Sequence, residues 1–358
     1  MDVSFEDYKY YPALRTRPAE MYGYRQLSDE SKRNMLPIIT LGAWRNQEGI
    51  SESISQLQKA VGERPFILDL TAESSHQNAA LRKVLDSEEN FKAWQSYVTD
   101  IPNAVPVIQI TPSAKNQQII RQTRQLENSG LGKVAFRITD FLSETDKVTT
   151  ALSAMDSPEN ALVIIDVGYI RETMAASIAA CVTAINQVRE DVEDAIIAVI
   201  STSFPASVTS HLDANSGGKR GIIGILERVL HQEIGGSEVA IYGDHSSIHA
   251  KVYANAGGRY TPRIDYPLYD AWAFERRPET NSTGYIDAAT TLIESYPEIL
   301  EDGSWGAEMI RKAAEGLIDG MKTPSSWIAA RVNMHISRQL ALSLESPDGD
   351  EEDFDIYE

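Results

Sequence analysis

The chain has 358 residues, of which 42% are hydrophobic and 24% are charged, and its formal net charge is −19. This composition is that of a folded protein, and so acidic a surface disfavours non-specific binding to nucleic acid or to anionic membranes. The chain has no run of 18 apolar residues, and its first ten residues lack the apolar stretch of a signal peptide. The single cysteine, Cys181, excludes an internal disulfide, so we expect a cytoplasmic protein in which it is a small core residue.

Short apolar runs rich in Val and Ile predict eight strands. These runs cover residues 10–17, 35–41, 66–71, 105–111, 134–139, 161–168, 195–202 and 239–244. Most are apolar on both faces, which is typical of parallel strands covered on both sides. Amphipathic helical patterns lie between them, for example over 54–61, 118–130, 171–188 and 221–235.

Eight strands, each followed by a helical pattern, predict an α/β fold, a single (β/α)8 barrel of the TIM type. The alternative is an open, doubly wound sheet. It is disfavoured because no run shows the polar alternation of an edge strand and no G-x-G-x-x-G follows the first run.

The pattern changes after the eighth strand. Residues 250–280 are rich in Gly, Pro and Tyr, which predicts an irregular or hairpin excursion, and helical patterns resume over 288–300, 306–321 and 325–344. We therefore predict one domain over 1–344. Residues 345–358 contain eight acids and are predicted to be a disordered tail that is dispensable for folding.

Each predicted strand carries a polar residue late in its run. In chain order these are Arg15, Thr40, Asp69, Gln109, Arg137, Asp166, Ser201 and Asp244. Barrel strands end together at one rim, so one polar residue per strand predicts a ring around the C-terminal mouth, where barrel enzymes place their chemistry. Arg17 follows Arg15 by two residues and would share its face.

The cations of this ring suit an anionic ligand, because an arginine fork binds phosphate or carboxylate through two parallel hydrogen bonds. The predicted ligand-binding residues are Arg15, Arg17, Gln109, Arg137, Ser201, Ser203, Arg263 and Arg276. The predicted catalytic residues are Asp166, Asp244 and His245, acting as base or metal ligand. The alternative is structural: Arg15 and Arg137 would form ion pairs with Glu20 or Asp166.

Two further segments suggest ligand sites. In the segment GDHSSIH, residues 243–249, Asp244, His245 and His249 could bind a divalent metal together with Asp69 or Asp166, although no metalloprotease-type signature accompanies them. The segment NSGGKRG, residues 215–221, precedes an apolar helical pattern, so backbone N–H groups at a helix N-terminus could hold an anion there. The alternative for 215–221 is an exposed loop.

The chain also resembles the phage "beta protein" family. The opening Tyr10, Pro12, Leu14 and Glu20 match that family's pattern Tyr-x-Pro-x-Leu-Lys-x-Lys-x-Gly-Glu, with arginines at 15 and 17 in place of the lysines and Ala19 in place of the glycine. Later blocks are similar too: PIITLG, VAFRIT, VIIDVG, SFP, IYGD and the stretch Arg263…Trp272…Arg276. The resemblance implies a phage or mobile-element context, in host takeover or antiphage defence, but no particular reaction. A guanidinium cannot form a Schiff base, so the arginines argue against that chemistry.

Three functions remain open from the sequence. The first is a barrel that binds or processes an anionic small molecule, such as a hydrolase of a nucleotide or phosphoester. The second is a non-catalytic protein whose acidic surface and tail bind a basic host or phage protein. The third is a nuclease-like subunit, against which the net charge of −19 counts. A ring of converging charges at the mouth favours the first.

Overall fold

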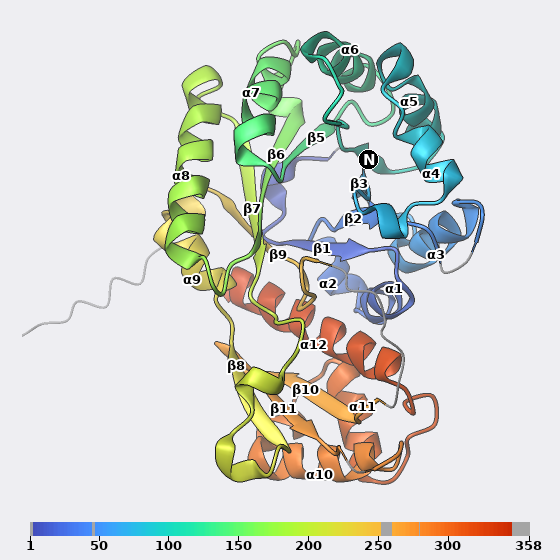
Figure 1. Cartoon of the computed structure of the whole chain (residues 1–358), viewed down its shortest axis with the longest axis vertical. Coiled ribbons are helices and arrows are strands. Elements are labelled where there is room, and N and C mark those ends of the chain that lie inside the picture. Colours follow the sequence, from blue (N-terminus) through green and yellow to red (C-terminus); the bar gives the residue numbers. More distant parts are fainter. Residues whose placement is uncertain (1–2, 45–46, 252–259, 279, 346–358) are drawn as a thin grey trace, which may run out of the picture.

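The larger part of the molecule is a parallel barrel with helices around it (Figure 1). The computed structural model describes residues 3–44, 47–251, 260–278 and 280–345. The barrel strands are β1 (Tyr11–Arg15), β2 (Ile38–Leu41), β3 (Phe66–Leu70), β4 (Ala104–Pro106), β5 (Val134–Ile138), β6 (Ala161–Tyr169), β7 (Ile196–Thr202) and β9 (Ile241–Asp244). Their order is β4-β3-β2-β1-β9-β7-β6-β5, and a parallel bridge from Val107 to Ala135 brings the two outer strands together. The predicted (β/α)8 barrel and all eight of its strands are confirmed.

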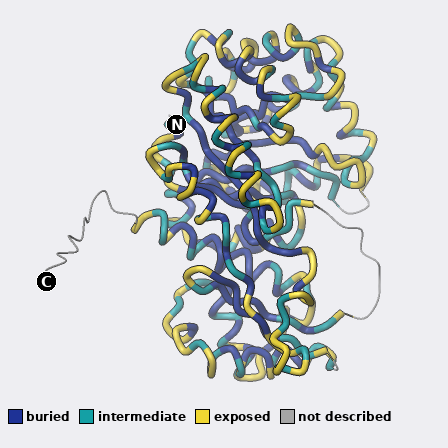
Figure 2. Tube along the Cα trace, turned by 60° about the vertical axis from the view of Figure 1, so that its left-hand side comes forward, coloured by how far each residue is buried: buried dark blue, intermediate teal, exposed yellow. Residues whose placement is uncertain are grey.

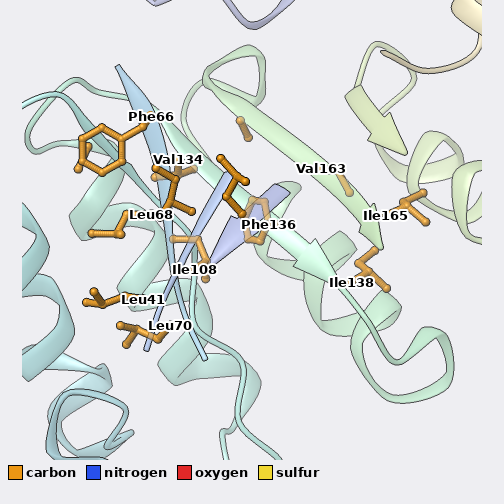
Figure 3. Close-up of a cluster of buried hydrophobic side chains, with 14 of the residues drawn as sticks. Leu41, Phe66, Leu68, Leu70, Ile108, Val134, Phe136, Ile138, Val163 and Ile165 are labelled. Atoms are coloured by element: carbon orange, nitrogen blue, oxygen red, sulfur yellow. The ribbon is translucent and has the colours of Figure 1, made fainter. Parts of the chain in front are cut away.

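The helices that follow these strands cover the outside of the barrel. They are α1 (Pro18–Arg25), α2 (Asp29–Arg33), α3 (Ser51–Val61), α4 (Ala79–Val84), α5 (Lys92–Thr99), α6 (Asn116–Glu127), α7 (Phe141–Leu152), α8 (Met174–Asp191) and α9 (Glu227–Glu233). The outward-facing strand residues, such as Leu68 and Phe136, pack with the helices in one large core (Figure 3). The inward-facing residues form a separate core inside the barrel, which the N-terminal segment closes through Val3 and Phe5.

A smaller antiparallel sheet lies beside the barrel; we call it the second sheet. It has the order β10 (Arg263–Pro267), β11 (Ala271–Arg276) and β8 (Arg220–Gly224). Strands β10 and β11 form a hairpin within the predicted 250–280 excursion, of which residues 252–259 and 279 lie outside the described residues. Helices α10 (Gly284–Ser295) and α11 (Trp305–Ala314) pack with residues of β10 in a core of their own.

Strand β8 corrects one prediction. Residues 221–235 were predicted as one amphipathic helix, but the structure divides them into β8 and α9. Within β8 buried and exposed residues alternate, and Ile222 is 57% exposed. The strand has five residues and is followed almost at once by a short helix. Five residues show too few repeats of the two-residue alternation for the sequence to distinguish the strand from the helix.

The last helix, α12 (Pro324–Glu345), lies between the barrel and the second sheet (Figure 1). Val332, Ile336 and Leu340 belong to the core around the barrel, whereas Ala330 and Met334 belong to the core of the second sheet. Both halves have buried interiors and exposed outer turns (Figure 2). The predicted tail, apart from Glu345, lies outside the described residues.

Candidate functional site at the barrel mouth

The direction of each strand side chain decides which predicted residues reach the mouth. Ile38 and Ile67 belong to the barrel interior, so Thr40 and Asp69, two residues further along, also face inward. Arg15, Thr40 and Asp69 are successive register partners in β1, β2 and β3 and therefore stand at one height. The same alternation turns Arg137 and Asp166 inward on β5 and β6.

These residues line a pocket of about 180 Å³ at the C-terminal ends of the strands, which we call the mouth pocket. Its polar lining includes Arg15, Glu20, Thr40, Asp69, Glu73, His76, Arg137, Asp166 and His245. The structure thus brings Arg15, Arg137, Asp166 and His245 of the predicted site together. Asp69 is there too, supported by the Nε2 of Gln109 at 3.1 Å from its Oδ1.

Arg137 links its own strand, β5, to three other strands across the pocket. Its Nη1 donates to Thr40 Oγ1 and to Asp69 Oδ2, both at 2.9 Å, and its Nη2 donates to Asp166 Oδ2 at 2.6 Å. Burial lowers the pKa of the guanidinium, but the two carboxylates outweigh it and raise that pKa above its ordinary value. Arg137 is therefore fixed as a cation that holds the two carboxylates apart. This contact is the ion pair of the structural alternative; a ligand-binding role for Arg137 stays a prediction.

Asp166 and His245 form a carboxylate–imidazole pair in the same pocket. Asp166 Oδ1 lies 2.8 Å from His245 Nε2 and accepts the backbone N–H of Gly168 at 3.0 Å. The Gly168 contact requires a bulge in β6 after Asp166 and a φ of +69° at the glycine. Burial raises the pKa of the carboxyl, but His245 and Arg137 outweigh it and hold the pKa well below its usual range.

An ionised carboxylate only accepts hydrogen bonds, so the Nε2 of His245 carries the proton of this contact. In the neutral imidazole the lone pair then lies on Nδ1, for which the described residues supply no hydrogen-bond partner. The pair is thus arranged so that His245 can take a proton while Asp166 stabilises the resulting cation.

A second ion pair lies at the end of β1. The guanidinium of Arg15 pairs with Glu20 at 3.1 Å, and the Arg15 backbone N–H also donates to Glu20 at 2.7 Å. This contact is likewise the one expected by the structural alternative. Arg17 is exposed, and its Nη2 lies 2.9 Å from His76 Nε2 at the pocket wall. Burial and the two arginines lower the pKa of His76, which favours its neutral form.

Asp244 lies outside the mouth pocket. The preceding residue, Gly243, approaches Tyr11 and Ile200 of the interior, so Asp244 points outward, toward α12. There its carboxylate accepts from Tyr10 Oη at 2.7 Å and Tyr242 Oη at 3.0 Å, and lies 3.0 Å from His335 Nε2. We call Tyr10, Tyr242, Asp244 and His335 the Asp244 network; all four are buried.

Ser201 and Ser203 also lie away from the pocket. Ser201 is the register partner of Asp244 and shares its outward direction. Ser203 donates through its Oγ to Glu227 at 2.6 Å, and its backbone N–H donates to the same carboxylate. Ser203 and Glu227 thus connect the end of β7 to the start of α9. Burial raises the pKa of the Glu227 carboxyl.

The remaining predicted ligand residues belong to the second sheet. Arg263 and Arg276 are register partners in β10 and β11, so the structure does not bring them to the mouth pocket. The segment 215–221 leads into β8 and not into a helix. The helix N-terminus that the predicted anion site required is therefore missing from this place, which corrects that prediction.

The candidate metal ligands do not converge. Arg137 stands between Asp69 and Asp166, and Asp244 faces the other side of the barrel wall. Within the described ranges, no group of three or more His, Cys, Asp or Glu side chains is placed to hold a metal ion.

Sequence reasoning missed His76 as a pocket residue and the strain after His245. Ser246 and Ser247 both adopt left-handed φ values, +52° and +62°, and both hydroxyls are buried with no hydrogen-bond partner among the residues that the structure describes. Such strain in non-glycine residues gathers at functional sites. The only signal in the sequence is the HSS run that ends the eighth strand; nothing in it reveals the backbone conformation.

Comparison with known proteins identifies the family. The family model for Beta protein matches residues 10–341. The chain belongs to the Beta protein family. A relative in that family, Protein beta of Enterobacteria phage P4, is 49% identical over 343 residues, which are 96% of each chain. The predicted resemblance is therefore confirmed, and a phage encodes this relative of the Beta protein family member described here.

Among solved structures, a biosynthetic arginine decarboxylase from Campylobacter jejuni aligns with a TM-score of 0.37 and 10% identity, over 94% of this chain and 56% of that one. So low a similarity supports no argument. In the described part of this Beta protein family member, no helix has the length and apolar character needed to cross a membrane.

Proposed function

We propose that this protein binds an anionic small molecule, a nucleotide or other phosphoester, in the mouth pocket and hydrolyses it with His245 as general base. The observation that carries the proposal is the contact of 2.8 Å between His245 Nε2 and Asp166 Oδ1 in a pocket at the mouth of the barrel. Barrel enzymes place their chemistry at this end.

The proposal gives each charged residue a distinct part. His245 removes a proton from the attacking water, whose oxygen bonds to phosphorus as the P–O bond to the leaving group breaks. The imidazolium then returns the proton to the leaving oxygen, and Asp166 holds the imidazole and stabilises its cation. Arg137 is a positioning residue, because its hydrogen bonds are already directed at Asp69 and Asp166. Arg15 and the exposed Arg17 are the cations that bind the anion.

The test is turnover of a panel of nucleoside phosphates and an aryl phosphoester, with phosphate release as the readout. We expect His245→Asn to lower kcat by about 100-fold or more, which is the usual contribution of a general base. Arg15→Gln should raise KM. His211→Asn is the matched control, since His211 lies outside the mouth pocket and should leave turnover unchanged. Equal turnover in His245→Asn and the wild type would refute the catalytic proposal.

The net charge of −19 favours one other function, the binding of a basic host or phage protein by the acidic surface. We propose a role in host takeover or antiphage defence for either function. Plaque assays with cells that carry His245→Asn or His211→Asn separate the two. Two results together indicate the interaction function: a plaque phenotype that persists in His245→Asn, and binding to a basic partner protein that is lost in about 0.5 M salt.

A further inference from the structure

Three arginines gather on the face of the second sheet that is turned away from its own core. Ile264 and Tyr266 of β10 pack in that core, so Arg263 and Asp265 face the other side. Arg276 is the register partner of Arg263. Arg331 of α12 completes the group, with its Nη1 3.0 Å from Asp265 Oδ2.

The charges of this group are not balanced. Asp265 is the carboxylate that Arg263 and Arg331 share, at 3.1 and 3.0 Å. Within the described ranges, the side chain of Arg276 makes one hydrogen bond, a long one of 3.5 Å to the carbonyl of Gly218. Glu20 also attracts Arg331, but its carboxylate is bound to Arg15.

Arg331 leaves a donor unused although it is buried. Its side chain is 5% exposed, and its Nε has no hydrogen-bond partner among the described residues. Its guanidinium lies 4.0 Å from the ring centroid of Phe204, and that of Arg263 lies 6.0 Å from the same ring. Burial and Arg263 lower the pKa of Arg331, to about 10, although Asp265 acts in the opposite sense.

Arg277 shows what a purely structural arginine looks like in the same sheet. Its Nη1 donates to Glu275 and to a carbonyl, and its Nη2 donates to the carbonyl of Asp287 and the hydroxyl of Thr291. The protein itself thus supplies acceptors for both terminal nitrogens of Arg277. In the described part of the chain, Arg263 and Arg331 share one carboxylate, Arg276 pairs with none, and the Nε of the buried Arg331 has no hydrogen-bond partner. An excess of positive charge around a buried arginine is costly to keep.

We propose that Arg263, Arg276 and Arg331 form a second anion site, separate from the mouth pocket, that binds a small phosphate-class oxyanion such as pyrophosphate. Guanidinium forks suit the oxygens of such an ion, and the ion supplies the charge that Asp265 alone does not. A small ion is favoured over a nucleic-acid backbone, because Arg331 is buried and the net charge of −19 repels a polyanion.

The test is calorimetric titration of the full chain with pyrophosphate at constant ionic strength. We expect binding that weakens about tenfold or more in Arg263→Gln and in Arg276→Gln, as charged hydrogen bonds are lost. Without the anion, Arg276→Gln should melt no lower than the wild type, since Arg263 repels Arg276. Arg220→Gln is the matched control: Arg220 lies in the same sheet, pairs with Glu275 and should bind pyrophosphate as the wild type does.

Three results would overturn the site. The first is an absence of binding at millimolar pyrophosphate, and the second is an equal loss of pyrophosphate affinity in Arg220→Gln. The third is displacement of the ion by a single-stranded oligonucleotide of about 20 nucleotides. Arg15→Gln distinguishes this site from the proposed function, because it removes a cation of the mouth pocket and should weaken only pyrophosphate bound there. The binding that depends on Arg263 and Arg276 should remain. Loss of affinity in Arg15→Gln alone would assign the ion to the mouth pocket and refute the second site.

Discussion

Asp166 and Asp244 each stand late in a barrel strand, and both are buried, yet their surroundings differ. Asp166 faces the interior and shares its charge between Arg137 and His245 beside the mouth pocket. Asp244 faces outward, where two tyrosines and His335 enclose it under α12. Side chains alternate between the two faces of a strand. A shift of one position along the strand therefore decides whether a carboxylate lies beside the pocket or is buried between the barrel and α12. The first is suited to chemistry and the second to fixing α12 on the barrel.

Acid should weaken both regions together, and this is the largest effect we expect. Both carboxyls have a pKa below its usual value in the folded chain, despite burial, because cations or hydrogen-bond donors face them. Each stabilises the fold above the unfolded pKa of about 3.9 and loses that contribution as pH falls below it. Glu227, whose pKa burial raises, acts in the opposite sense.

Urea titrations at pH 7, 5, 4 and 3 measure this dependence. The free energy of unfolding should fall below about pH 4, and Asp166→Asn and Asp244→Asn should each make the fall shallower. A wild type equally stable at pH 3 and pH 7 would contradict the ionised state of both carboxyls.

Arg137→Met should break the mouth while leaving the Asp244 network in place. It removes the cation from Asp69 and Asp166 at once, so we expect a loss of about 3–5 kcal/mol in the free energy of unfolding. Arg15→Met is the comparison: it removes the partner of one buried carboxylate and not of two, and Glu20 keeps the hydrogen bond from the residue 15 backbone N–H. It should therefore cost less than Arg137→Met. Equal stability of Arg137→Met and the wild type would show that Arg137 is free to serve a ligand instead.

Asp244→Asn should do the reverse. The amide group of asparagine turns a donor toward hydroxyls and an imidazole that already donate, so we expect a loss of about 2–3 kcal/mol. Below its melting transition the variant should keep the turnover proposed for the mouth pocket. Loss of kcat in a folded Asp244→Asn protein, with stability preserved, would place Asp244 in the catalytic machinery.

Gly168→Ala probes the support of Asp166 more gently. No atom lies within 4 Å of the position of an added Cβ, so the cost comes from the left-handed φ of +69° alone. We expect about 1–2 kcal/mol of destabilisation. Gly217→Ala is the matched control, since it also has a positive φ and an open position but lies in the turn before β8. Only Gly168→Ala should change the pH profile of turnover.

The barrel was predictable because its strands are separate apolar runs. The mouth was predictable only in part. On β1, β2, β3, β5 and β6 the late polar residue happens to face inward, so Arg15, Thr40, Asp69, Arg137 and Asp166 converge. On β7 and β9 it faces outward, and the inward residue after Gly243 is His245. The position of a polar residue near the end of a strand does not show whether its side chain faces inward or outward. That is known only once the inward-facing residues earlier in the same strand are known.

The second sheet was harder to predict. Its strands are short, and β8 comes from a segment far from the hairpin with which it pairs. The sequence shows arginines at 263 and 276 but not that they are cross-strand partners, nor that Arg331 reaches them from α12. Such contacts depend on how the last helix docks, which local periodicity does not encode.

Helix α12 also has a consequence for how the protein is made. It is the last element of the described chain and contributes residues to the core around the barrel and to that of the second sheet. A ribosome releases the N-terminal strands first. Neither core can be completed before the final helix emerges, so a nascent chain stalled before residue 324 exposes apolar surface on both halves at once. We expect premature termination there to yield a chaperone substrate rather than a partly working barrel.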